Sequence, residues 1–422
     1  MGWLVPRSRL TPTQLRAVEL SPEEHRVFAG PPGCGKTLVL VHRAAHLRDR
    51  HGVSPDRFRI LVFTNALVSY IRSALPLLDI PAGCVSTFDS WCVRFYRGRI
   101  GRSLPEAGDR ESTDFPAVRK AVAAHLRKSP LREKPYDFVM VDEGQDLDAA
   151  SFEILRGIAA HVTVCTDSKQ QIFESGSSER EIVELLGVRR RHLSFLEAYR
   201  CCPYVARLGS RFIGDPEERS QYLAQVRVEQ GERETPLLFV ARSKPEEVAR
   251  MSAILRLRLA KGERVAVILP RSAMVYGYAK RLQDDGIEVE TYRQMNFDNL
   301  RPKLISYHSA KGLTVDTVLL PRLTAASFRK FGPELAERLL FVGITRAQRW
   351  VYMSTVANDD NVFAPLRRLI GDAGPGCIEV QYGSDGTYQP GLFGPPAAPP
   401  RRTETPAPGA SSADDDDLTS LL

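Results

Sequence analysis

Long apolar runs and paired cysteines are both lacking in this sequence. No stretch approaches the roughly 18 uninterrupted apolar residues that a membrane-spanning helix needs, and the amino end lacks the apolar run of a secretory signal. The seven cysteines include no CxxC pair, which argues against a disulfide scaffold and a cysteine zinc site. We therefore expect a cytoplasmic protein with reduced thiols.

An acidic balance is also lacking. The chain has a formal net charge of +7, and residues 1–384 carry 56 Lys and Arg against 45 Asp and Glu. This net positive charge favours a polyanionic partner such as nucleic acid. An Arg-rich solvated surface explains a moderate excess of basic residues about as well. Charge alone supports nucleic acid only weakly.

Sequence repeats are absent, but short apolar runs recur in two series. They alternate with longer amphipathic segments over residues 26–196 and again over about 236–356. This alternation is typical of parallel α/β sheets, and the chain is long enough for two domains. We predict an α/β fold of two doubly wound domains, over 1–192 and 193–382.

Two segments depart from that alternation. A Gly-, Pro- and Arg-rich piece at about 95–135 predicts a small insertion on the first domain. Residues 383–422 are rich in Pro, Ala, Ser and Asp, and they cannot bury enough apolar area to offset their ordering entropy. We expect this tail to be disordered and its acidic end to be solubilising. The alternative is that the acidic end mimics nucleic acid and occupies the basic cleft.

A phosphate-binding loop is the strongest motif. GPPGCGKT at 30–37 matches GxxxxGK[ST] and lies between a strand candidate and a helix candidate. Its amides can surround phosphates, Lys36 can reach the β- and γ-phosphates, and Thr37 can bind magnesium. The predicted nucleotide-binding residues of the loop are Gly30, Pro31, Pro32, Gly33, Cys34, Gly35, Lys36 and Thr37.

Two adjacent carboxylates follow another strand candidate, in FVMVDEGQD at 138–146. Asp142 can hold magnesium, while Glu143 can orient and deprotonate an attacking water. An Asp-Glu pair alone is more often a solvated turn. A pair that ends a buried strand downstream of a phosphate loop instead indicates hydrolysis.

The order of these motifs resembles that of superfamily 1 helicases of the UvrD/Rep kind over most of residues 10–356. The resemblance implies two RecA-like P-loop NTPase domains that use ATP and Mg²⁺. In LTPTQLRAV at 10–18 it implies that Gln14 binds adenine. It places Gln170, Arg200 and Arg346 at the γ-phosphate, Arg346 as the arginine finger, and Gly312 near the phosphates.

Four blocks resemble the strand-binding segments of that family: VFTNALVSYIR at 62–72, STFDSWC at 86–92, TDSKQQIF at 166–173 and ISYHSAKGLTVDTVLLP at 305–321. An aromatic residue such as the one at 173 is otherwise more often a core residue. The nucleic-acid contacts that the resemblance implies are Phe63, Thr64, Asn65, Thr87, Phe173, His308, Ser309 and Lys311.

Three residues depart from the family pattern. Thr314 stands where most members have a glutamate that binds the ribose, which leaves sugar selectivity open. Asp89 replaces a histidine, which would weaken or reroute a link between strand and nucleotide, and Gly144 replaces an alanine. The family's large insertions are nearly absent.

The resemblance implies an ATP hydrolase that acts as a 3′ to 5′ single-stranded DNA translocase or helicase in DNA repair, replication or recombination. The alternative is an ATP-dependent nucleic-acid-binding switch or a partner-dependent subunit, for example in anti-phage defence. QPGLF at 389–393 resembles the QxxLF peptide that docks on the sliding clamp through Gln389, Leu392 and Phe393. A chance match explains this pentapeptide at least as well.

Overall fold

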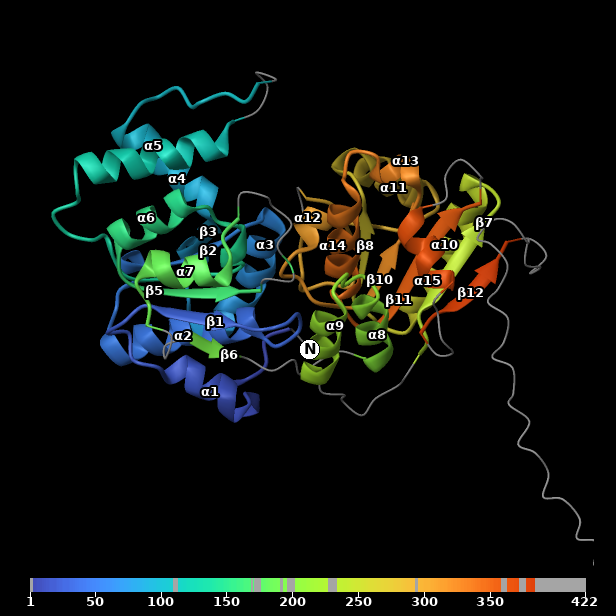
Figure 1. Cartoon of the computed structure of the whole chain (residues 1–422), viewed down its shortest axis with the longest axis horizontal. Coiled ribbons are helices and arrows are strands. Elements are labelled where there is room, and N and C mark those ends of the chain that lie inside the picture. Colours follow the sequence, from blue (N-terminus) through green and yellow to red (C-terminus); the bar gives the residue numbers. More distant parts are fainter. Residues whose placement is uncertain are drawn as a thin grey trace, which may run out of the picture.

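The computed structural model describes residues 3–108, 113–167, 170, 176–189, 193–195, 202–226, 234–292, 295–357, 363–371 and 377–383. These residues form two sheets, each flanked by helices (Figure 1). The predicted tail beyond Gly383 lies outside the described residues, and so do Phe173 and Arg200.

The first sheet has the strand order β3-β2-β4-β5-β1-β6, and its strands pair in parallel. Its strands are β1 (Arg26–Ala29), β2 (Phe58–Val62), β3 (Val85–Thr87), β4 (Tyr136–Val141), β5 (Ala159–Thr166) and β6 (Leu193–Phe195). Its helices are α1 (Pro12–Glu19), α2 (Lys36–His51), α3 (Asn65–Ala74), α4 (Phe88–Arg99), α5 (Phe115–Lys128), α6 (Ala149–Ile158) and α7 (Glu179–Leu186). Short 3-10 turns occupy Arg7–Arg9, Pro55–Arg57, Leu75–Leu78, Ala82–Cys84 and Gly144–Asp146.

The second sheet has the order β12-β7-β11-β10-β8-β9 and is also parallel. Its strands are β7 (Leu237–Ala241), β8 (Val265–Leu269), β9 (Lys303–Ser306), β10 (Val315–Leu320), β11 (Ala347–Val356) and β12 (Glu379–Tyr382). The helices of this half are α8 (Pro203–Ser210), α9 (Pro216–Gln225), α10 (Lys244–Ala260), α11 (Ser272–Asp284), α12 (Tyr307–Ala310), α13 (Ala325–Phe328), α14 (Pro333–Ile344) and α15 (Ala364–Gly371).

The predicted α/β fold with two parallel sheets is confirmed, and strands recur in both predicted series, over 26–196 and about 236–356. The strands that the sequence did not reveal, β3, β6 and β12, have three or four residues each and lie at sheet edges. Because β6 pairs with β1, residues 193–195 lie in the first sheet and not in the unit predicted over 193–382.

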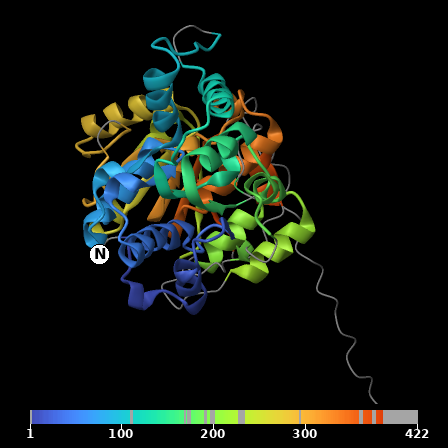
Figure 2. The same cartoon turned by 90° about the vertical axis from the view of Figure 1, so that its left-hand side faces the viewer.

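The piece at 95–135 contains the end of α4 and the whole of α5. Val118 and Val122 of α5 are fully buried against the apolar side chains of α4 and α6. Figures 1 and 2 show α4 and α5, in cyan, on the outer side of the first sheet. In the described part of this piece, the chain adds a helical layer to the sheet.

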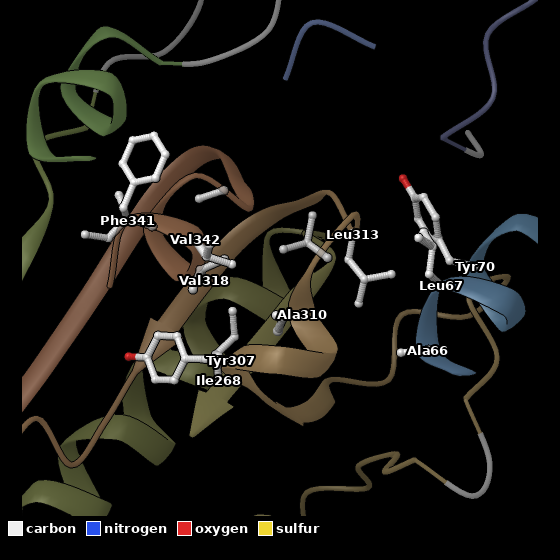
Figure 3. Close-up of a cluster of buried hydrophobic side chains, with 14 of the residues drawn as sticks. Ala66, Leu67, Tyr70, Ile268, Tyr307, Ala310, Leu313, Val318, Phe341 and Val342 are labelled. Atoms are coloured by element: carbon white, nitrogen blue, oxygen red, sulfur yellow. The ribbon is translucent and has the colours of Figure 1, made fainter. Parts of the chain in front are cut away.

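An apolar core joins the two sheets. It extends from the helices of the first sheet to Phe341 and Val342 on α14. Figure 3 shows Leu67 and Tyr70 of α3 facing Leu313, which lies just before β10. No helix in the described ranges is long and apolar enough to cross a membrane.

Candidate nucleotide and nucleic-acid site

The phosphate loop connects β1 to α2. Gly33 and Gly35 have φ angles of 79° and 83°, the left-handed region that favours glycine. A Cβ added at Gly35 would lie 2.6 Å from Nε2 of Gln14. The glycines therefore allow both the turn and the close approach of α1.

Gln14 makes three hydrogen bonds, one of which reaches this loop. Its backbone amide donates to Oγ1 of Thr11 at 3.2 Å, and its Oε1 accepts from the amide of Thr11 at 3.1 Å. Its Nε2 donates to the carbonyl of Cys34 at 3.0 Å. This capping box fixes the amide of Gln14 at the rim of the loop.

Lys36 begins α2 and turns back over the loop. Its Nζ donates to the carbonyl oxygens of Gly30 at 2.7 Å and Pro31 at 3.0 Å, and to Oδ2 of Asp167 at 3.2 Å. Burial disfavours the charge, but Asp167, together with Cys34, Glu143 and Asp142, outweighs it and raises the pKa of Lys36 above its usual range. Lys36 is thus a fixed cation.

The side-chain oxygens of Thr37 and Asp142 lie next to each other. Oγ1 of Thr37 donates to Oδ2 of Asp142 at 2.5 Å. Burial and the neighbouring Glu143 raise the pKa of Asp142 to about 6, against the opposing hydrogen bond from Thr37. A hydroxyl and a carboxylate are oxygen donors of the kind that Mg²⁺ prefers, so these residues fit that ion.

Glu143 follows β4 in a left-handed conformation, with a φ of 57°. Its Oε2 accepts from Nε2 of Gln145 at 2.5 Å, and Oε1 of Gln145 accepts from the amide of Asp167 at 3.0 Å. Gln145 thus orients the carboxylate while remaining tied to the end of β5. An unusual backbone conformation held by surrounding bonds is common at functional sites.

Gly144 is explained by packing. A Cβ at this position would lie 2.2 Å from Cγ1 of Val164, on the neighbouring strand β5. Val164 therefore leaves no space for an alanine at position 144, and this explains the glycine. It does not change the carboxylates on either side.

The second sheet completes the cleft with Arg346, which lies between α14 and β11. Its Nη2 donates to Oε1 of Gln170 at 2.6 Å, and Nε2 of Gln170 donates to Oδ2 of Asp167 at 2.5 Å. Its Nε donates to the carbonyl of Val342 at 2.9 Å. Burial lowers the pKa of Arg346 below its usual range. Hydrogen bonds therefore connect Arg346 through Asp167 to Lys36.

One cleft gathers residues from both sheets. The predicted nucleotide-site residues among those that line it are Gln14, Pro32, Gly33, Gly35, Lys36, Thr37, Glu143, Gln170, Gly312 and Arg346. Gly30, Pro31, Cys34 and Asp142 contact this set through the bonds described above.

The predicted nucleic-acid contacts of the first sheet follow two adjacent strands. Thr64 caps α3 by accepting from the amide of Leu67 at 3.2 Å, and Thr87 caps α4 by accepting from the amide of Ser90 at 3.1 Å. Phe63 is half-buried and Asn65 is exposed. Since β2 and β3 are parallel neighbours, these residues meet at one edge of the sheet, and their role stays a prediction.

The contacts predicted from the second sheet lie on or beside α12, which packs near α3. His308 is half-buried, and its ring lies 5.9 Å from that of Phe331. Oγ of Ser309 accepts from Oγ of Ser306 at 3.3 Å. α12 thus brings His308 and Ser309 toward the edge that carries Asn65.

Lys311, a predicted nucleic-acid contact, is not exposed. It is fully buried, and its Nζ donates to both carboxylate oxygens of Asp146, at 2.7 and 2.6 Å. Burial raises the pKa of Asp146 to about 7, against the opposing charge of Lys311. The structure therefore places Lys311 in a contact between the two halves and not on a face open to a strand.

The carboxylate of Asp89 also has a partner, the side chain of Arg119. Arg119 of α5 donates to Oδ1 of Asp89 at 2.7 Å and to Oδ2 of Asp148 at 3.0 Å. The carboxylate that replaces the family's histidine therefore connects α4 to α5 and α6.

Sequence reasoning missed Asp167, Asp146 and the aromatic wall of the cleft, which Trp3 and Tyr70 form. Asp167 had a usable signal, because it follows a predicted strand in the same way as Asp142. Trp3 and Tyr70 had none, since they come from the amino end and from the middle of a helix.

In the described residues, these observations define a P-loop NTPase fold with a cleft between two RecA-like halves. The family model described as UvrD/REP helicase N-terminal domain matches residues 10–133. The model described as UvrD-like helicase C-terminal domain matches residues 304–354. The two matched segments are thus similar to the amino-terminal and carboxyl-terminal domains of UvrD-like helicases.

The chain is 35% identical over 98 residues to the ATP-dependent DNA helicase PcrA of Bacillus subtilis, which is 22% of this chain and 13% of that protein. It is 36% identical over 94 residues to PcrA of Staphylococcus epidermidis, 21% of this chain and again 13% of the relative. The aligned part thus spans a small share of these relatives.

A solved structure described as the C-terminal domain of a possible DNA helicase from a Lactobacillus shares 15% identity, with a TM-score of 0.34, over 43% of this chain and 98% of that one. A likeness this low adds nothing to the fold described above.

Proposed function

We propose that this chain is a nucleic-acid-stimulated ATPase that moves along single-stranded DNA from 3′ to 5′. The observation that carries the proposal is the contact of Arg346, from the second half, with Gln170 beside Lys36. An arginine finger contributes to hydrolysis only when it is held at the γ-phosphate. Hydrolysis would therefore depend on how the two halves close. The direction of movement rests on the resemblance alone.

Each side chain has a defined task in this proposal. The loop amides and Lys36 bind the phosphates, and Lys36 exchanges its backbone carbonyls and Asp167 for phosphate oxygens. Thr37 and Asp142 would hold Mg²⁺, which supplies positive charge to the phosphates when it is bound. Glu143 orients and deprotonates the attacking water, and Arg346 stabilises charge on the transferred group.

The ion pair of Lys311 with Asp146 supports a link between the ATP site and the site of the DNA strand. Asp146 lies three residues after Glu143, and Lys311 lies three residues after the predicted strand contact His308. Nζ of Lys311 is also 3.8 Å from Oε2 of Glu143. Movement of α12 on a bound strand would therefore shift a charge beside the hydrolytic carboxylate.

The partners we propose are single-stranded or tailed DNA, and the sliding clamp through residues 389–393. The setting we propose is DNA repair, replication or recombination in the cytoplasm. These are consistent with the PcrA relatives, which are described as DNA helicases.

The test is ATP turnover by the full chain without nucleic acid and with single-stranded DNA, tailed duplex, blunt duplex or RNA. We expect stimulation by orders of magnitude with single strands, since an arginine finger is worth about 10³-fold or more. The Glu143→Gln variant should stay inactive with every nucleic acid of the panel. Equal rates with and without strands would contradict the proposal.

The same panel separates the two candidate functions. Displacement of a strand from the tailed duplex would indicate a helicase. Strand-stimulated hydrolysis without displacement would favour the ATP-dependent switch. Stronger stimulation of ATP turnover by RNA than by DNA would indicate that the protein acts on RNA.

A further inference from the structure

A second cavity opens at the amino ends of β2 and β4, beside the outer helical layer of the first sheet. Its volume is about 430 Å³, and its lining comes from these strand ends, from α4 and from the segment just before β4. The phosphate loop and the predicted strand contacts follow the carboxyl ends of β1, β2 and β3. Because the strands are parallel, this cavity lies at the opposite end of the sheet from both.

The floor of this cavity is apolar and held in place. Nε1 of Trp91 donates to the hydroxyl of Tyr136 at 2.9 Å, and the ring of Phe95 stacks on that of Trp91 with centroids 5.3 Å apart. Trp91 and Tyr136 are buried, whereas Phe95 is half-buried. Leu131 and Pro135, also half-buried, complete the floor. An apolar side chain that entered the cavity would therefore contact a ring and two aliphatic groups.

Three guanidinium groups surround this floor. Arg59 lies over the ring of Tyr136, 5.0 Å from its centroid, and its Nη1 donates to three backbone carbonyls at 3.0, 3.4 and 2.6 Å. Arg94 and Arg99 are exposed on α4. None of the three forms an ion pair among the described residues, and Glu133 is the one carboxylate in the described lining. The lining thus carries an excess of positive charge.

The spacing of residues on α4 brings charge and apolar surface together. Trp91, Phe95 and Arg99 are four residues apart, and Arg94 follows Trp91 by three, so all of them share one face of the helix. Arg97 is also exposed on α4 but does not line the cavity. The helix therefore offers an arginine outside the cavity for comparison.

We propose that this cavity is a docking site for an acidic peptide segment of a partner protein. The segment would insert one apolar side chain against Phe95 and pair its carboxylates with Arg94 and Arg99. Clusters of arginine recognise acidic motifs, because a guanidinium fork matches the two oxygens of a carboxylate. The inference does not depend on the proposed function, since the cavity and the nucleotide cleft share no described lining residue.

A nucleic-acid strand fits this cavity less well than a peptide does. Surfaces that bind single strands combine a continuous basic groove with ring faces on which successive bases stack. Here the rings of Trp91 and Tyr136 are buried, and Glu133 would repel a phosphate backbone that continued past the arginines.

The test is the binding of a fluorescently labelled synthetic peptide, four aspartates followed by a phenylalanine, to the full chain, measured by fluorescence anisotropy. We expect saturable binding that weakens as salt is raised, because salt screens exposed charges. A peptide with serine in place of the phenylalanine should bind about tenfold more weakly or worse, since it lacks the apolar contact.

Charge reversals on α4 test the site itself. The double variant Arg94→Glu, Arg99→Glu should weaken the labelled peptide by about tenfold or more, because two attractive groups become repulsive. Arg97→Glu is the matched control and should bind the peptide as the parent chain does. Strand-stimulated ATP turnover should be the same in both variants and the parent, so a failure of the proposed function would be seen separately.

Absence of saturable binding to the parent chain would overturn the inference. An equal loss in Arg97→Glu and in the double variant would also overturn it, because it would indicate non-specific attraction to a basic helix. If the double variant lost affinity for single-stranded DNA and kept its affinity for the peptide, the cavity would be a nucleic-acid contact. If the peptide bound only after Asp414, Asp415, Asp416 and Asp417 were changed to Asn, the occupant would be this chain's own acidic segment and not a partner.

Discussion

Asp142 lies where the fold disfavours its charge. It is buried beside Glu143, and these effects raise its pKa to about 6 although Thr37 donates a hydrogen bond to it. The unfolded chain loses this proton near pH 4, so the folded chain without metal loses stability as pH rises from about 4 to about 6. A bound cation would reverse that penalty.

The first prediction concerns this cation. Because Mg²⁺ needs the ionised carboxylate, its apparent affinity should fall as pH falls below about 6, by about tenfold per pH unit. The measurement is a magnesium titration of nucleotide binding at pH 5.0 and 7.5. The Asp142→Asn variant should bind Mg²⁺ weakly at both values. A parent affinity independent of pH over this range would contradict the assignment.

Gly144 carries the second prediction. Gly144→Ala should lower the free energy of unfolding by about 1–3 kcal/mol, because the new Cβ would stand 2.2 Å from Cγ1 of Val164. Adding Val164→Ala to this variant removes the overlap and should recover part of the loss. Urea unfolding of the single and double variants tests both points. If the double variant loses more free energy of unfolding than the two single variants lose together, the packing explanation is refuted.

How far the sequence predicts single residues depends on how local their contacts are. Lys36, Thr37 and Asp142 could be assigned because each follows a strand within one short motif. Lys311 could not, because its partner Asp146 lies 165 residues away and only the packing of two halves brings them together. A buried ion pair and a strand contact look the same in sequence.

At the scale of elements, α1 depends on a single buried cation. Nη1 of Arg43, on α2, donates to the carbonyls of Ala17, Val18 and Leu20 at 3.2, 3.1 and 2.6 Å. Its Nε donates to Oγ1 of Thr163 on β5 at 2.9 Å. Burial lowers the pKa of Arg43 to about 9, yet the side chain satisfies the free carbonyls at the carboxyl end of α1.

The third prediction follows from this contact. Arg43→Met should lower the free energy of unfolding by about 2–4 kcal/mol, because it leaves buried carbonyls without donors. It should also weaken ATP binding, since α1 carries Gln14. Arg50→Met, at an exposed position on the same helix, is the control. Unfolding and ATP affinity unchanged in Arg43→Met would show that α1 is held by other contacts.

Elements were predictable where their patterns were long. The central strands β4 and β5 are buried on both faces and read as apolar runs, whereas the edge strands β3 and β12 have three and four residues. Strand order could not be predicted, because parallel neighbours are joined by long connections and the sequence does not show which strands pair.

At the scale of the whole molecule, the two halves meet through a glycine. Gly312 has a φ of 76°, and a Cβ there would lie 2.7 Å from Cδ2 of Leu67 on α3. Leu313 follows it, and Nη1 of Arg346 donates to the carbonyl of Leu313 at 3.4 Å. The helix that begins beside the predicted strand contacts thus packs directly against the segment that supports Arg346 (Figure 3).

The fourth prediction separates this contact from backbone strain. Gly312→Ala should reduce strand-stimulated turnover by about tenfold or more, because closure is obstructed by Leu67. Gly286→Ala is the matched control, since Gly286 has a φ of 75° with no atom within 4 Å of the added Cβ. Similar turnover in the two variants would show that the apolar contact does not transmit closure.

We propose that catalysis is divided between the two halves, with nucleotide binding in the first and transition-state stabilisation from the second. The direct measurement is ATP affinity and strand-stimulated turnover of Arg346→Ala beside Arg349→Ala, an arginine that is 64% exposed. We predict that Arg346→Ala lowers kcat by about 10³-fold and leaves the Kd for ATP nearly unchanged, while Arg349→Ala resembles the parent. Weakened ATP binding with a normal kcat in Arg346→Ala would contradict the claim.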